Sequence, residues 1–165
     1  MQHVQTRSTT SALVLTAVLI ALATLFTMYT KIPVPGIRGY FNVGDVVIMT
    51  SALLLGRKYG AYIGALGPAL ADLFLGYAVF VPITFVVKGI EGYLVGTVYN
   101  NKTTTSALVA TIVGGIVIVA GYFIAEYFVF DPGVAIVSIL TNTIQAVMSV
   151  IISMILYAIL RRRLA

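Results

Sequence analysis

Two opposite charges, Lys88 and Glu91, lie inside an otherwise apolar run that covers residues 81–99. On a helix, a spacing of three residues places both side chains on one face, where they can form an ion pair. Ionisable groups within a hydrophobic span cost about 3 kcal/mol each and usually face a bundle interior or a wet cavity. Two interpretations are open: the pair fixes helix packing, or Lys88 presents its ammonium group to a ligand while Glu91 keeps it charged and aimed.

Polar side chains from other apolar runs are expected at a similar depth. At a rise of about 1.5 Å per residue, Asp72 lies about 7 Å below the outer surface, Lys88 about 10 Å and Asn142 about 12 Å. Helices that run in opposite directions thus bring these groups into the same outer half of the bilayer, which predicts a pocket open to the outside. Tyr77 is added because an aromatic ring can stack on a flat ligand. The predicted ligand-binding residues are Asn42, Asp45, Asp72, Tyr77, Lys88, Glu91, Asn142 and Gln145.

The composition excludes several kinds of chemistry. The chain has no cysteine, and its one histidine is His3 in the polar N-terminal segment. Disulfides, thiolate nucleophiles and cysteine- or histidine-based metal sites are therefore excluded, and no metal site is predicted. An intramembrane aspartyl protease would use Asp45 and Asp72, but its Gly-x-Gly-Asp element requires glycine where Asn42 stands. No catalytic residue and no enzymatic activity are predicted.

The hydropathy indicates lipid as the solvent. The chain of 165 residues is 60% hydrophobic and 9% charged, and its mean hydropathy is +1.06. Soluble domains carry about 25% charged residues, so the predicted fold class is an all-α integral membrane protein. The net charge of +5 does not indicate a nucleic-acid partner. Arg161, Arg162 and Arg163 adjoin an apolar run, which is typical of a membrane-flanking cluster.

Six membrane spans are predicted, because a crossing needs about 20 apolar residues. They cover residues 11–30, 41–56, 59–77, 81–100, 106–130 and 134–160 of a single transmembrane domain, 1–165. The second span is short, at about 24 Å if fully helical. Arg7, Lys58 and the terminal arginines fall on one side of the membrane. The positive-inside rule therefore predicts that both termini are cytoplasmic and that the loop 31–40 faces outside.

Small residues recur at four-residue spacing on two predicted helices. Ala17 and Ala21 do so on the first span, and Gly60 and Gly64 on the third. Such faces let helix backbones approach closely. They indicate packing within the bundle or, on a terminal helix, docking against another membrane protein.

The stretch GYFNVGDVVIMTSALLLGRKYGAYIGALGPALADLFLGYAVFVPITFVVKGIEGYLVG, residues 39–96, resembles the substrate-binding S components of energy-coupling factor (ECF) vitamin transporters, within the riboflavin-transporter-like group. The signals are GYFN-x-GD, ALAD and KG-x-EG in this order, and the six-span layout extends the resemblance to nearly the whole chain. The resemblance implies a multi-pass protein of the prokaryotic plasma membrane that captures a small water-soluble vitamin or precursor from outside. Hydroxymethylpyrimidine and pyridoxine are the implied ligands, and riboflavin is a weaker third choice.

The resemblance also implies partners and a lid. A membrane T component would contact Ala17 and Ala21, and two cytosolic ATPases would use the ATP. This chain contains no Walker motif, so it cannot hydrolyse ATP itself, and no cofactor of its own is expected. The loop between the first two spans would close over the ligand. The residues assigned to this lid are Lys31, Pro33, Pro35, Arg38 and Tyr40.

A self-contained secondary transporter or channel for a small polar solute is the alternative from another functional class. Its usual features are inverted repeats and helices broken near the midplane. The sequence shows no convincing inverted repeat, and its polar groups lie away from the centre of the bilayer. A purely structural membrane subunit is a third reading, which tight binding of a small molecule would exclude.

Overall fold

The computed structural model describes residues 9–30, 32–33, 40–99 and 103–164. These residues form six α-helices and one two-stranded antiparallel hairpin, which confirms the predicted all-helical class with six helices. The helices are α1 (Thr9–Tyr29), α2 (Gly44–Leu55), α3 (Arg57–Phe74), α4 (Phe80–Val98), α5 (Thr104–Val129) and α6 (Pro132–Leu164), and the strands are β1 (Ile32–Pro33) and β2 (Tyr40–Phe41).

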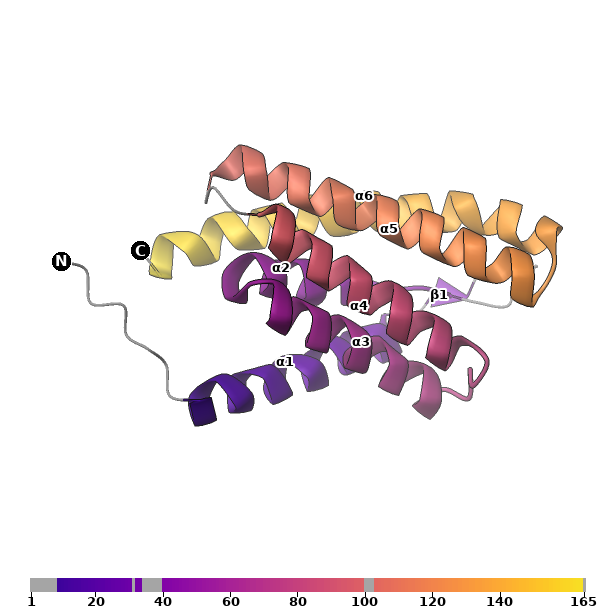
Figure 1. Ribbon diagram of the computed structural model, residues 1–165, viewed down its shortest axis with the longest axis horizontal. Coiled ribbons are helices and arrows are strands. Elements are labelled where there is room, and N and C mark those ends of the chain that lie inside the picture. Colours follow the sequence, from indigo (N-terminus) through magenta and orange to yellow (C-terminus); the bar gives the residue numbers. More distant parts are fainter. Residues whose placement is uncertain (1–8, 31, 34–39, 100–102, 165) are drawn as a thin grey trace.

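The long helices run along a common direction. The start of α1 and the end of α6 lie at one end of the bundle, and β1 and the turn between α5 and α6 lie at the other (Figure 1). An even number of crossings requires this arrangement of the two helix ends. That this end faces the cytoplasm stays a prediction of the positive-inside rule.

Four of the described helices, α1, α4, α5 and α6, are long and apolar enough to cross a membrane. Helix α3 has 18 residues but is less apolar, because it contains Arg57 and Lys58 in its first turn and Asp72 in its last. Helix α2 has 12 residues, a length of about 18 Å. It is therefore shorter than the span of 41–56 expected from the sequence.

The short α2 follows from how the chain enters it. Tyr40 and Phe41 form β2 and pair with β1, so they extend the hairpin instead of the helix. The Oδ1 atom of Asn42 then accepts a hydrogen bond from the backbone N–H of Gly44 at 2.8 Å. This local bond turns the chain from the strand into the first residue of α2, because asparagine side chains readily bond the backbone two residues further on.

Helix α2 lies in the centre of the bundle. Its residues Gly44 to Leu53 are all buried, and it packs against α1, α3, α4 and α6. A helix that is apolar all round needs protein or lipid on every side. Here the other helices surround it, so a length well below the thickness of the hydrocarbon layer is sufficient.

Helices α3 and α4 approach closely through glycines. A Cβ atom on Gly64 would lie 2.1 Å from the carbonyl oxygen of Lys88, and one on Gly60 would lie 2.5 Å from that of Gly92. The small face of Gly60 and Gly64 is therefore used within the bundle. It fixes the backbone of Lys88 against α3, because small residues permit the closest backbone contact between helices.

Helix α1 presents Ala17 and Ala21 away from the bundle. Ala17 and Ala21 are exposed, whereas Thr16 and Thr24 are buried. The hydroxyl of Thr24 donates to the carbonyl oxygen of Gly67 on α3 at 2.9 Å. The two threonines thus do not add polarity to the outer face of α1, which carries the exposed apolar side chains of Leu13, Val14, Val18, Leu22 and Leu25.

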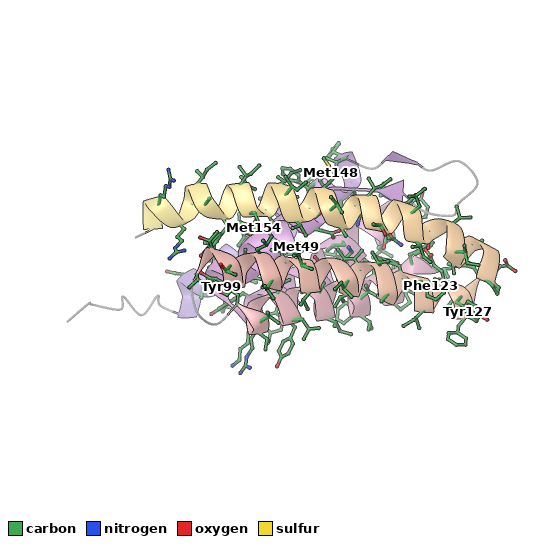
Figure 2. All side chains as sticks on the ribbon, turned by 90° about the horizontal axis from the view of Figure 1, so that it is seen from above. Met49, Tyr99, Phe123, Tyr127, Met148 and Met154 are labelled. Carbon is green, nitrogen blue, oxygen red and sulfur yellow. The ribbon has the colours of Figure 1, made fainter. Side chains whose placement is uncertain are left out.

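Aromatic residues mark both ends of the bundle. Phe123 and Tyr127 lie near the end of α5 that turns into α6, and Tyr99 lies at the opposite end (Figure 2). The hydroxyl groups of Tyr99 and Tyr157 share a hydrogen bond. Amphipathic rings at both ends are typical of residues at the two interfaces of a membrane.

Candidate functional site

A cleft opens between the helices near the end that carries Tyr127. The space between its walls is about 590 Å³ with the open mouth included. Side chains from α1, α3, α4, α5 and α6 contribute, together with the segment after β2 and the turn before α4. The lining residues are Thr27, Asn42, Pro68, Asp72, Tyr77, Phe80, Thr84, Lys88, Tyr122, Glu126, Ser138, Thr141, Asn142 and Gln145.

Lys88 lies in the wall of this cleft and is 1% exposed. Its Nζ atom donates to Oδ1 of Asp45 at 2.5 Å and lies 3.4 Å from Oε2 of Glu91. The same ammonium group lies 5.4 Å from the centre of the Tyr122 ring, a distance at which a cation is attracted to an aromatic face. Lys88 is therefore held in one place by partners on three sides.

Asp45 connects Lys88 to two further elements. Its Oδ2 atom accepts a hydrogen bond from Nε2 of Gln145 on α6 at 2.7 Å. The Oε1 atom of Gln145 in turn accepts from the backbone N–H of Asn42 at 3.1 Å. The result is a continuous chain of hydrogen bonds from α4 through α2 to α6 and the segment after β2. Buried hydrogen bonds that connect several elements in this way make a site rigid.

Glu91 is fully buried one helical turn below Lys88. Neither of its carboxylate oxygens has a hydrogen-bond partner among the residues that the structure describes. Its one described ion pair is with Lys88 at 3.4 Å. Glu91 thus acts on the cleft through Lys88.

The structure brings six of the eight predicted ligand-binding residues to the wall of the cleft: Asn42, Asp72, Tyr77, Lys88, Asn142 and Gln145. Asp45 and Glu91 lie behind this wall and hold Lys88. Both interpretations of the Lys88–Glu91 pair thus find support in the geometry, because the ion pair exists and Lys88 also lines the cleft. That any of these residues binds a ligand stays a prediction.

Only part of the predicted lid can be placed. Lys31, Pro35 and Arg38 lie outside the described residues. Pro33 and Tyr40 are partners in the register of the β1–β2 hairpin. Asn42, two residues after Tyr40, lines the cleft, so the hairpin lies next to this site.

Several cleft residues were missed from the sequence. Thr27, Thr84, Ser138 and Thr141 are hydroxyl residues in apolar helices, and Tyr122 and Glu126 lie on α5. The Oγ1 atom of Thr84 and the hydroxyl of Tyr122 lie 3.0 Å apart and share a hydrogen bond. Its position in the sequence places Glu126 near the outer end of the fifth span, but it was not among the predicted ligand-binding residues. The face of the helix on which each hydroxyl lies could not be predicted from depth alone.

The acidic side chains of the site fall into two pairs. Within the described ranges, His, Cys, Asp and Glu side chains form no group of three or more that could hold a metal ion. Asp72 and Glu126 line the cleft, whereas Asp45 and Glu91 are engaged with Lys88. The arrangement is suited to hydrogen bonding of a small polar molecule.

Known proteins resemble this chain over almost its full length. The model of the family described as "ECF-type riboflavin transporter, S component" matches residues 7–162. An "uncharacterized protein in gap 3' region" of Pyrococcus woesei is 40% identical over 144 residues, which are 86% of this chain and 95% of that protein. The thiamine precursor transporter HmpT of Lactococcus lactis subsp. cremoris is 30% identical over 149 residues, 89% of this chain and 83% of that protein.

Two solved structures share the fold. The S component of a bacterial ECF transporter superposes with a TM-score of 0.77 at 21% identity, over 94% of this chain and 98% of that one. The S component for biotin from an ECF-type ABC transporter gives a TM-score of 0.64 at 20% identity, over 94% of both chains. The family match and the apolar helices together show a multi-pass protein of the cell membrane, and the chain belongs to the family of ECF-type riboflavin transporter S components.

Proposed function

We propose that this chain is the substrate-binding subunit of an ECF-type importer and binds hydroxymethylpyrimidine in the cleft above Lys88. The observation that carries the proposal is the convergence of polar side chains from five helices on one cleft, next to the hairpin between α1 and α2. The family match supports the transport role. The relative named as a thiamine precursor transporter supports the choice of a pyrimidine.

The walls of the cleft suit a small flat heterocycle. Tyr77 and Phe80 stand edge to face with their ring centres 6.4 Å apart, and they supply apolar surface beside the polar groups. Hydroxymethylpyrimidine carries an exocyclic amino group, two ring nitrogens and a hydroxymethyl group. The amide of Asn142 can bond an amino group and the adjacent ring nitrogen together, as asparagine does with adenine in nucleic acids.

Lys88 supplies a hydrogen-bond donor in a fixed position. Its ammonium group has three N–H bonds, and within the described residues Asp45 and Glu91 are its ionic partners. A ring nitrogen or a hydroxyl oxygen of the ligand is the acceptor that fits the cleft side of this group. Because the surrounding network holds the ammonium group in place, little entropy is lost when the ligand binds.

The energy for transport is assigned to partners. We propose that the chain works with a membrane T component and two cytosolic ATPases, and that the exposed face around Ala17 and Ala21 contacts the T component. The exposed apolar surface of α1 supports this assignment, because small residues on an outer helix face permit close helix docking.

Mass spectrometry of ligand that co-purifies with the protein in nanodiscs, followed by calorimetric titration, tests the proposal. We expect hydroxymethylpyrimidine to bind most tightly, and pyridoxine, riboflavin and thiamine to bind at least about tenfold more weakly, a difference of about 1.4 kcal/mol. Tighter binding of pyridoxine would correct the substrate. Binding of none of the four would refute the proposal.

A second experiment separates the S component from a self-contained transporter. Lipid vesicles that contain this chain alone are expected to bind the labelled ligand but not to accumulate it. Accumulation driven by an ion gradient would overturn the assignment of the energy to partner subunits.

A further inference from the structure

Glu126 is a buried carboxylate that the network around Lys88 does not use. It lies near the end of α5, is 4% exposed and lines the cleft. Its Oε2 atom has no hydrogen-bond partner among the described residues. Both described salt bridges belong to Lys88, and neither involves Glu126.

The hydroxyl group beside Glu126 is engaged elsewhere. Ser138 on α6 lies within hydrogen-bond reach of the Glu126 carboxylate, and the single hydrogen of its hydroxyl is directed to the carbonyl oxygen of Ala135 on its own helix at 2.9 Å. One turn deeper on α5, the hydroxyl of Tyr122 shares a hydrogen bond with Thr84. Among the described residues, the Oε2 atom of Glu126 thus has no hydrogen-bond partner, even though hydroxyl groups lie near the carboxylate.

An unsatisfied buried acceptor is costly, and more so when it belongs to a carboxylate. Asp45 shows the contrast, because both of its oxygens are satisfied by Lys88 and Gln145. An acceptor left open in the wall of a cleft is suited to a donor that arrives with the ligand. The absence of a nearby described cation favours a donor such as an amino group over an anionic ligand.

We propose that Glu126 accepts a hydrogen bond from the exocyclic amino group of the ligand and thereby sets the specificity for an aminopyrimidine. Asn142 lies one turn from Ser138 on α6, in the same cleft. An amino group has two N–H bonds, so Glu126 can accept one of them while the Asn142 amide accepts the other and donates to the adjacent ring nitrogen. This assignment rests on the proposed function, because it requires the pyrimidine to occupy this cleft.

The test removes either the amino group of the ligand or the carboxylate of Glu126. Hydroxymethylpyrimidine and its analogue without the amino group are titrated into the wild-type protein, Glu126→Gln and Glu126→Met in nanodiscs. We expect the affinity for the aminopyrimidine to fall about tenfold in the glutamine variant and about a hundredfold in the methionine variant, in line with a hydrogen bond to a charged group. The affinity for the analogue should change less than about threefold in both.

Asp131→Asn is the control. Asp131 is an exposed carboxylate near the same end of the bundle, and it does not line the cleft. We expect its substitution to leave the ratio of the two affinities unchanged. Thermal unfolding without ligand checks that the Glu126 variants fold, and removal of an unsatisfied polar group predicts no loss of stability.

The outcomes separate the two assignments. A wild-type protein that binds both compounds equally, or a ratio that Glu126→Met does not change, overturns the role of Glu126 and leaves the proposed function in place. A wild-type protein that does not bind the aminopyrimidine overturns both.

Discussion

The pairing of Lys88 with Asp45 predicts that Asp45→Asn destabilises the wild-type protein but stabilises the Lys88→Met variant. The Nζ–Oδ1 distance is 2.5 Å, the Nζ–Oε2 distance to Glu91 is 3.4 Å, and the three side chains are buried. With an effective dielectric constant of about 20, these distances correspond to attractions of about 6.6 and about 4.9 kcal/mol. Most of this attraction is offset by the cost of removing the charges from water.

Removing the charge of Lys88 or Asp45, alone and together, measures the energetic coupling between the two side chains. Lys88→Met leaves two buried carboxylates without a cation, and we expect a loss of about 3–5 kcal/mol in the free energy of unfolding. Asp45→Asn in the wild-type background leaves the Lys88–Glu91 pair and removes a charged hydrogen bond, a loss of about 1.5–3 kcal/mol. In the Lys88→Met background the same Asp45→Asn change removes an unpaired buried charge, so it should stabilise the protein by about 1–3 kcal/mol.

Equilibrium unfolding by sodium dodecyl sulfate in mixed micelles measures these differences. Tyrosine fluorescence is the signal, because the chain has ten tyrosines and no tryptophan. Asp131→Asn is the control, since Asp131 is exposed and its substitution should change stability by less than about 0.5 kcal/mol in either background. Equal losses from Asp45→Asn in both backgrounds would show that Asp45 and Lys88 are not coupled.

Three further predictions test the packing and the outer face. Gly64→Ala should destabilise the protein by about 3 kcal/mol and weaken ligand binding, because its Cβ would lie 2.1 Å from the carbonyl oxygen of Lys88. Gly89→Ala is the control for this change, because its Cβ would lie 3.2 Å from the Cβ of Ala65. It should cost less than about 1 kcal/mol in the same unfolding assay. Thr24→Val removes the hydrogen bond to Gly67 on α3 and should cost about 0.6 kcal/mol. Thr16→Val removes only a bond to Ala12 on the same helix and should cost less; equal losses would contradict a role for the interhelical bond. Ala17→Leu and Ala21→Leu should leave calorimetric ligand affinity unchanged but reduce co-purification of the T component by about tenfold, and full assembly by both variants would remove α1 from the proposed interface.

The general location of the site was predictable because depth along a helix follows from sequence position. A fixed rise per residue placed Asp72, Lys88 and Asn142 in the same outer layer, and all three line the cleft. The Lys88–Glu91 pair was also predictable, since its spacing is local. Depth does not determine which neighbour a side chain faces, so the stronger partner of Lys88, 43 positions away on α2, was not predicted.

The beginning of α2 shows a second limit. Residues from position 41 onward are apolar enough to continue a span, but Phe41 pairs with β1 and the helix begins at Gly44. Pairing between residues on either side of the loop is a tertiary contact, and such contacts override local helix preference. Because the helix begins at Gly44, Asp45 lies in the first turn of α2 and beside Lys88. The helix dipole also favours a negative charge at this position.

Asp45 and Glu91 lie behind the wall of the cleft and determine where Lys88 lies in it. Gly64 lets the backbone of Lys88 lie against α3, Asp45 pulls the ammonium group toward the central α2, and Gln145 ties α2 to α6. Because these contacts exist without a ligand, the cost of ordering the donors is met when the protein folds. Glu126 differs, since its open acceptor is satisfied only when a donor enters the cleft. Substitutions of Asp45 should therefore lower stability and affinity together, whereas substitutions of Glu126 should change which ligand binds.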